Sequence, residues 1–166
     1  MVNKISERLG ISPPDVYIVE SNVLNAFAVK HGKKNVILLT DDIVHGTLVS
    51  ENTGTLAYIL AHEIGHVALG HNGFIRSFIR SKYSALSRLD EYSADSVALS
   101  LINNKQDAVA GLIILTVGPH LGKYINGASL ATQVKEVASN SYSKKSEKSL
   151  SHPLLLNRIN KILAKS

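Results

Sequence analysis

The chain has 166 residues, of which 45% are hydrophobic and 19% charged, a composition typical of one folded domain rather than of a disordered segment. It contains no cysteine, which excludes disulfide frameworks, thiolate zinc fingers, iron–sulfur clusters and cysteine nucleophiles. The net charge is +5, but the basic residues are spread along the chain, so we interpret this charge as favouring solubility rather than nucleic-acid binding.

The first forty residues predict one short helix and three short strands. A helix over 2–9 ends at Gly10, a residue type common at helix C-termini. A β-type run covers 16–19. Two more, over 24–29 and 35–39, are separated by a short glycine-containing segment and predict a hairpin.

The rest of the chain predicts helices. Apolar residues recur at intervals of three and four over 53–69 and 83–101, the spacing of one helical face. The other predictions are helices over 43–49, 107–117, 129–138 and 153–164, a loop over 119–129, a mobile polar loop over 140–151 and an ambiguous segment over 73–82. Short strands followed by helices predict an α+β fold, with a small three-stranded sheet packed on a helical bundle in a single domain over 1–166.

The sequence predicts no membrane span. The first ten residues lack the apolar centre of a secretory signal. The longest apolar run, 108–122, is interrupted by Gly118 and Pro119 and is shorter than a spanning helix requires. We expect a cytoplasmic chain, or a membrane-associated one if it is a piece of a longer protein.

A metal-binding motif lies inside the predicted helix 53–69. It reads His62-Glu63-Ile64-Gly65-His66, that is, His-Glu-x-x-His (HExxH). Residues four apart share a helical face, so His62 and His66 can bind the same zinc ion. Glu63 can then accept a proton from a water on that ion, as a general base. Because the surrounding turn is apolar, we interpret these residues as a binding site rather than as solvated surface.

A catalytic zinc site needs a third protein ligand, and the predicted helix 83–101 supplies candidates. Glu91 and Asp95 lie four apart on its polar face. We expect Glu91 to be the third ligand and Asp95 to accept a hydrogen bond from a ligating imidazole. Asp90 is the competing candidate for the third ligand. His71 either is a fourth ligand or caps the carbonyl groups at the end of the helix predicted over 53–69.

Four motifs in chain order resemble the HtpX-type zinc metallopeptidases. This gluzincin family also includes the CaaX prenyl endopeptidases and the Oma-type mitochondrial proteases. The matching segments are His-Glu-Ile-Gly-His-Val-Ala-Leu-Gly-His over 62–71, Glu91-Tyr92-Ser93-Ala94-Asp95, Asn25-Ala26-Phe27-Ala28, and Ser151-His152-Pro153 with Arg158. The resemblance implies a soluble zincin catalytic domain. Since HtpX and the prenyl endopeptidases carry transmembrane helices and this sequence has none, a membrane-embedded substrate is not implied.

The resemblance also assigns roles to individual residues. It implies one zinc ion per chain with His62, His66 and Glu91 as ligands, Glu63 as the general base, and His152 and Arg158 at the border of the active site. The implied activity is that of a zinc metalloendopeptidase, which hydrolyses peptides or unfolded proteins with a metal-activated water. A role in proteolytic quality control is a further expectation.

Two more roles follow from the chemistry of peptide hydrolysis. The oxyanion that develops on the scissile carbonyl needs a hydrogen-bond donor, and His152 is the candidate, with Arg158 orienting it or sharing the charge. The alternative is that His152 is only the residue before a helix start. The strand Asn25-Ala26-Phe27-Ala28 is expected to bind substrate by offering its edge to an extended peptide.

Three other functions remain open at this stage. An ImmA-like repressor-cleaving protease would share the His-Glu-x-x-His motif, but not the Asn-Ala-Phe-Ala and His-Pro…Arg segments. A non-catalytic, chaperone-like zinc module would not need Glu63. A basic nucleic-acid binder would be expected to carry a recognition motif, and we find none in the sequence.

Overall fold

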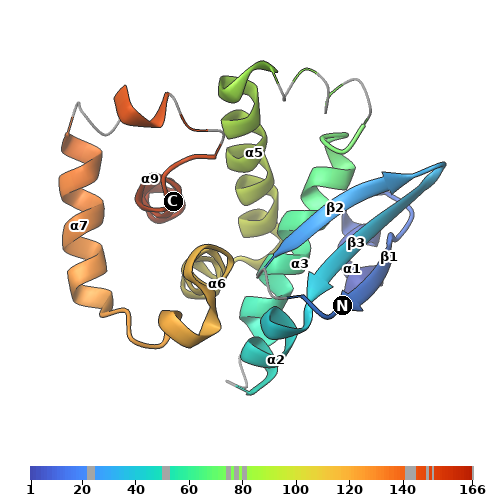
Figure 1. The fold of residues 1–166 in the computed structure, drawn as a ribbon, viewed down its shortest axis with the longest axis horizontal. Helices are drawn as coiled ribbons and strands as arrows, with labels where there is room; N and C mark the ends of the chain where they lie inside the picture. The colour runs from blue at the N-terminus through green and yellow to red at the C-terminus, as the bar shows by residue number, and fades with distance from the viewer. Residues whose placement is uncertain are drawn as a thin grey trace.

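The computed structural model describes residues 1–21, 25–49, 53–73, 76, 79, 82–140, 145–148, 150 and 152–165 (Figure 1). The helices and strands, in chain order, are α1 (Val2–Arg8), β1 (Asp15–Val19), β2 (Ala26–His31), β3 (Lys34–Thr40), α2 (Asp41–Val49), α3 (Thr53–Ala68), α5 (Ser84–Ile102), α6 (Lys105–Gly122), α7 (Gly127–Ser139) and α9 (Leu155–Ala164). The predicted α+β fold with a three-stranded sheet is confirmed.

Strand β3 is the centre of the sheet, whose order is β1-β3-β2. The predicted hairpin pairs β2 with β3 in antiparallel register, with Phe27 opposite Leu38, while β1 runs parallel to β3. Ile37 and Leu39 of β3 alternate onto the buried face and join the core, where helices α2 and α3 meet the sheet. Within the described ranges, strand β2 therefore has one paired edge and one open edge.

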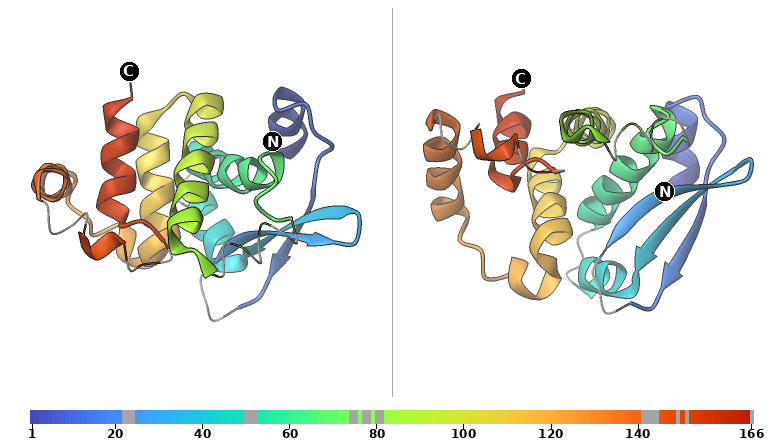
Figure 2. Two further views of the ribbon diagram at one scale, coloured as in Figure 1. Left: turned by 90° about the horizontal axis from the view of Figure 1, so that it is seen from above. Right: turned by 45° about the horizontal axis from the view of Figure 1, so that its top comes forward.

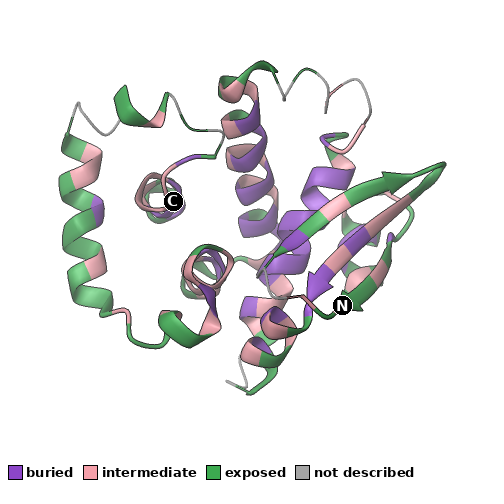
Figure 3. Ribbon diagram, in the orientation of Figure 1, coloured by how far each residue is buried: buried purple, intermediate pink, exposed green. Residues whose placement is uncertain are grey.

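Helix α3 is the central element of the fold. The sheet lies on one side of it, and α5, α6 and α9 follow on the other side, with α7 outermost (Figures 1 and 2). The stretch 58–67 of α3 is buried all round, which is unusual for a helix that also contains two histidines and a glutamate (Figure 3). The sheet and the later helices therefore pack around the same few turns of α3.

Local signals explain where α5, α6 and α7 begin and end. Asn103 adopts a left-handed conformation (φ 52°) that ends α5. The side chain of Asn104 accepts hydrogen bonds from the backbone N–H groups of Gln106 and Asp107 and so caps the start of α6. Asn126 caps α7 in the same way, which places its start at Gly127, two residues before the prediction.

Two predictions about helix boundaries were wrong in part. The loop predicted over 119–129 is helical to Gly122, after a kink at Gly118 (φ 84°, ψ 162°). Pro119 favours this arrangement, because proline suits the first turn of a helical segment that follows a break. The last helix begins at Leu155 rather than at Pro153.

Other predictions fall partly outside the described residues. Most of the ambiguous segment 73–82 does so, as do 141–144, 149 and 151 of the predicted mobile loop. Lys145–Lys148 forms a helical turn, in which Glu147 accepts hydrogen bonds from the Tyr92 hydroxyl and from the backbone N–H of Leu154. Within the described part of the chain, no helix has both the length and the apolar character required to cross a membrane.

The contact between α3 and α6 predicts a large effect of Gly111→Ala. A Cβ atom added at Gly111 would lie 2.5 Å from Cδ1 of Tyr58, whose side chain is fully buried. We expect the free energy of unfolding in urea to fall by about 1–3 kcal/mol, because the packed ring has no space into which to move. Gly127→Ala is the matched control, because an added Cβ there has no neighbour within 4 Å. Equal effects of the two substitutions would contradict the packing described here.

Candidate metal centre

His62 and His66 bring two imidazole nitrogens together on one face of α3. Both side chains are buried, and their Nε2 atoms lie 3.1 Å apart. This follows from the spacing of four residues, which stacks the two side chains one helical turn apart. The rings are nearly perpendicular, at 82°.

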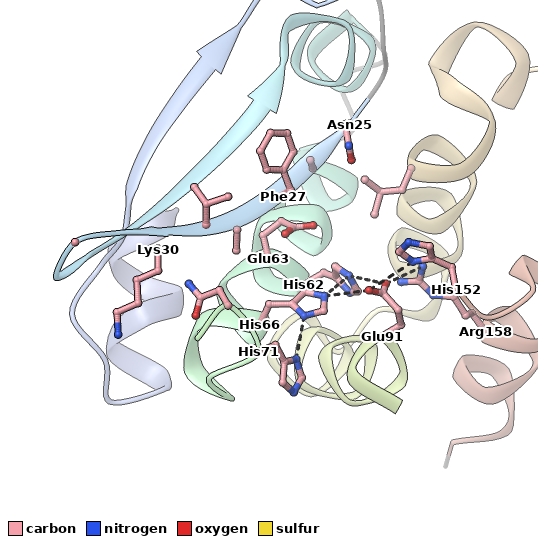
Figure 4. Close-up of a pocket in the computed structure, with 16 residues that line it drawn as sticks. Asn25, Phe27, Lys30, His62, Glu63, His66, His71, Glu91, His152 and Arg158 are labelled. Carbon is pink, nitrogen blue, oxygen red and sulfur yellow. Dashed lines mark hydrogen bonds and ion pairs between the residues drawn. The ribbon is translucent and has the colours of Figure 1, made fainter. Parts of the chain in front are cut away.

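Glu91 of α5 brings a carboxylate to the same point. Its Oε2 lies 3.5 Å from Nε2 of His62, and its Oε1 lies 3.6 Å from Nε2 of His66. Helix α5 packs directly on α3, so the side chain of Glu91, in the middle of α5, reaches the histidine pair. Figure 4 shows these contacts as dashed lines.

The three side chains fit a zinc ion. Ligands about 2.0–2.1 Å from a tetrahedral ion are about 3.3–3.4 Å from one another. The separations of 3.1, 3.5 and 3.6 Å between the two imidazole nitrogens and the carboxylate oxygens are close to that value. Two imidazoles and one carboxylate also form a ligand set typical of catalytic zinc.

Asp95 lies behind His62, on the side away from Glu91. Its Oδ1 is 3.0 Å from Nδ1 of His62, at ion-pair distance but without the alignment of a straight hydrogen bond. Tyr58 donates a 3.0 Å hydrogen bond to the same oxygen. Arg158 of α9 donates from Nε to Oδ2 (2.8 Å) and from Nη2 to Oδ1 (2.6 Å). The orientation of the Asp95 carboxylate is therefore set by two other side chains.

The charges of this buried group depend on one another. Burial by itself would lower the pKa of His62, but the carboxylates of Asp95 and Glu91 outweigh it and raise this pKa to about 10. Burial by itself would raise the pKa values of the two carboxyl groups. The opposing effects of His62 and Arg158 hold the pKa of Glu91 well below its usual range and bring that of Asp95 to about 2.

Glu63 lies on the opposite side of the histidine pair, toward strand β2. Figure 4 shows its carboxylate between the strand and the imidazoles. Burial raises the pKa of Glu63 to about 7, and a hydrogen bond from the backbone of Ala28 acts in the opposite direction. Glu63 is not one of the three residues whose ligand atoms lie close together, and it lines the cleft beside β2.

An open cleft of about 770 Å³ gives access to the group. Strand β2 and the residue before it line one wall, from Asn25 to Lys30, and the histidine pair, Glu63 and Glu91 form the floor. His152 and Arg158 line the cleft from the C-terminal segment. His152 is largely exposed, and its Nδ1 is 3.8 Å from Oε1 of Glu91.

The structure brings together the site residues that the sequence predicted. It places the two alternative candidates, Asp90 and His71, outside the group of three possible ligands. Asp90, the competing third ligand, is instead paired with Arg76 and lies 3.4 Å from Nε2 of His71. The His71 side chain is not in the group formed by His62, His66 and Glu91. Its Nδ1 lies 2.9 Å from Nδ1 of His66, and it is the backbone N–H of His71 that caps the carbonyl of His66.

Sequence reasoning missed two residues of this group, Tyr58 and Arg76. Tyr58 lies four residues before His62, so the helical spacing could have identified it as a neighbour on the same face. Arg76 carries no comparable signal, because it reaches Asp90 from outside the regular helices α3 and α5.

The position of Arg158 predicts a large loss of stability in Arg158→Met. The substitution leaves the buried carboxylates of Asp95 and Glu91 without their guanidinium partner. We expect the free energy of unfolding of the metal-free protein to fall by about 3–5 kcal/mol. Lys161→Met, one turn later on α9, is the control, because the exposed ammonium only covers the Tyr92 ring and contributes about 0.5–1 kcal/mol. Similar losses in the two variants would show that Arg158 does not compensate the buried carboxylates.

Comparisons with known proteins agree with these motifs. The family model for Peptidase U49 matches residues 42–166, and that for Peptidase family M48 matches residues 1–82. Protease HtpX of Shewanella pealeana is 26% identical, over 98% of this chain and 71% of its own length. Protease HtpX of Acinetobacter baumannii is 41% identical over 42% of this chain and 22% of its own length.

An archaeal protein is also similar. The HtpX homolog of Pyrococcus abyssi is 29% identical over 70% of this chain and 40% of its own length, so the chain spans less than half of this relative. No solved structure matches. The U49 model covers most of the chain, and the HtpX proteases match it in both its strand-containing and its helical part. The chain is thus similar to the HtpX proteases that its motifs resemble, and it belongs to the peptidase U49 family.

Proposed function

We propose that this chain is a zinc-dependent endopeptidase, with one zinc ion held by His62, His66 and Glu91. The observation that carries the proposal is the triangle of two imidazole nitrogens and a carboxylate, with sides of 3.1–3.6 Å, at the floor of an open cleft. Membership of a metallopeptidase family gives this triangle an enzymatic interpretation.

Glu63 is the proposed general base. A zinc ion at this site would polarise the scissile carbonyl and lower the pKa of a bound water toward about 7. The Glu63 carboxylate lies beside the histidine pair and lines the cleft, from where it can accept a proton from a water and later donate it to the leaving amine. Its contact with the backbone of Ala28 fixes it relative to β2.

His152 is the proposed donor to the developing oxyanion. Its ring is exposed to the cleft and close to Glu91, so it can turn toward a bound substrate. Arg158 is buried against Asp95 and Glu91, and we propose that its charge acts on the site mainly through these carboxylates. Asp95 in turn orients His62 through Nδ1, which favours binding of the metal by Nε2.

Strand β2 is the proposed binding site for the substrate backbone. Among the residues that the structure describes, β2 pairs only with β3, which leaves its second edge open along the wall of the cleft. An extended peptide can add to such an edge through main-chain hydrogen bonds, which do not depend on its sequence. Asn25, Ala26, Phe27 and Ala28 would then lie beside the scissile bond. This mode fits peptides and unfolded proteins as substrates, and proteolytic quality control as the process.

Glu63→Gln is predicted to retain the metal and to lose hydrolysis. The amide keeps the shape of the side chain but cannot accept a proton, and Glu63 is not one of the three proposed ligands. Cleavage of a fluorescent unfolded casein, with zinc content measured by mass spectrometry on the same samples, tests both parts. Wild-type protein treated with a chelator should lose activity and recover it with zinc. Loss of zinc from Glu63→Gln, or full activity in this variant, would contradict the assigned role.

His152→Ala is predicted to bind zinc normally and to hydrolyse slowly. Losing one oxyanion donor costs about 10²–10³ in kcat, with little change in KM. His45→Ala is the control, since His45 is exposed on α2 and does not line the cleft. If His152→Ala and His45→Ala had the same kcat, His152 would be no more than the residue before the last helix.

A further inference from the structure

The geometry points to His71 as a positioning residue that holds the metal ligand His66 in its metal-binding form, with Asp90 and Arg76 holding His71 in turn. This inference rests on the proposed zinc site. It concerns a path that starts at Nδ1 of His66, the ring nitrogen that does not face Glu91, and that is formed by side chains which the proposed mechanism does not otherwise use.

Each link of the path is a contact between buried groups. Nδ1 of His71 lies 2.9 Å from Nδ1 of His66, and Nε2 of His71 lies 3.4 Å from Oδ1 of Asp90. Arg76 donates to both oxygens of Asp90, from Nε to Oδ2 at 3.3 Å and from Nη2 to Oδ1. Asp90 is fully buried and His71 is 4% exposed, whereas Arg76 is half-buried at the surface end.

The turn after α3 explains how His71 comes to lie under His66. Gly70 follows the helix in a left-handed conformation (φ 71°), which reverses the chain. The backbone N–H of His71 then bonds the carbonyl of His66 at 2.9 Å, and the two rings meet at 67° with centroids 5.0 Å apart. The contact between the rings is therefore built into the C-terminal cap of the helix.

The positions of the protons along this path follow from the metal site. If Nε2 of His66 binds the ion, the hydrogen of this neutral ring is on Nδ1 and points at His71. Nδ1 of His71 must then be the acceptor, so the hydrogen of His71 is on Nε2 and faces Asp90. Every donor in the series meets an acceptor, and only one pair of tautomers satisfies all of them.

The other histidine ligand has a path of the same kind. Nδ1 of His62 faces Asp95, and Asp95 is held by Arg158. Each proposed imidazole ligand is thus linked to a carboxylate–arginine pair. His62 contacts its carboxylate directly, whereas His66 is connected to its pair through the imidazole of His71. Groups in this position set the orientation and the basicity of a metal-bound imidazole.

A pair of nearly isosteric substitutions separates positioning from packing. In His71→Asn, the side-chain oxygen can take the place of Nδ1 and accept from His66, whereas His71→Leu has no acceptor there. Zinc affinity is measured by competition with a chelator, cobalt coordination by the visible spectrum of the cobalt-loaded protein, and stability by urea unfolding of the metal-free protein.

We expect His71→Leu to weaken zinc binding by about 10–100-fold and to alter the cobalt spectrum, and His71→Asn to retain most of the affinity. The free energy of unfolding of the metal-free protein should not follow the order of the zinc affinities, because a buried Leu packs at least as well as a buried Asn. A His71→Leu protein with the wild-type zinc affinity and cobalt spectrum, or with higher zinc affinity than His71→Asn, would overturn the inference.

Arg76→Gln tests the surface end of the path. Because the glutamine amide can still donate a hydrogen bond to Asp90, we expect this variant to fold and to weaken zinc binding less than His71→Leu does; unchanged affinity would remove Arg76 from the path. Wild-type protein is measured in parallel. Failure of the wild type to bind zinc would overturn the proposed function itself, whereas tight wild-type binding with an unaffected His71→Leu would overturn only the role of His71.

Discussion

The structure depends on the burial of an ionisable cluster at the contact between α3 and α5. Glu63, Glu91, Asp95 and Asp90 are all less than 10% exposed, in a part of the chain where apolar side chains would cost far less to bury. Buried carboxylates are retained only where cations or donors surround them, and here these are imidazoles, the Tyr58 hydroxyl and two arginines. A metal ion in the triangle of His62, His66 and Glu91 would add the positive charge on the side of the cluster that faces the cleft.

The rest of the fold supplies this cluster with its partners. The sheet covers α3 from one side and provides the backbone of Ala28 next to Glu63, together with an open strand edge along the cleft. Helix α9 returns from the far end of the chain and delivers Arg158, 63 residues after Asp95. The segment before α9, which carries His152, is tied to α5 through the bond from Tyr92 to Glu147. Most described elements thus contribute a contact to the same buried cluster.

Much of this arrangement was predictable from short-range patterns. Alternating apolar residues indicate the strands, and apolar residues three and four apart indicate the long helices. The spacing of four residues places His62 and His66 on one helical face. These short-range patterns do not by themselves predict the tertiary contacts. Asp90 and Glu91 are neighbours on one helix, and only the packing of α5 on α3 decides that Glu91 faces the histidines while Asp90 faces His71 and Arg76. The helical turn after Gly118 is not predicted, because glycines at 118, 122 and 127 indicate a loop, whereas Pro119 here starts a new turn.

The central claim is that one zinc ion is bound between α3 and α5, and anomalous diffraction at the zinc edge tests it most directly. Crystals of the zinc-loaded wild-type protein should contain one strong anomalous peak per chain, about 2.0–2.2 Å from Nε2 of His62, Nε2 of His66 and a carboxylate oxygen of Glu91. An ion bound by Asp90 or His71 in place of one of these ligands, or no peak at the cluster in zinc-saturated crystals, would contradict the account.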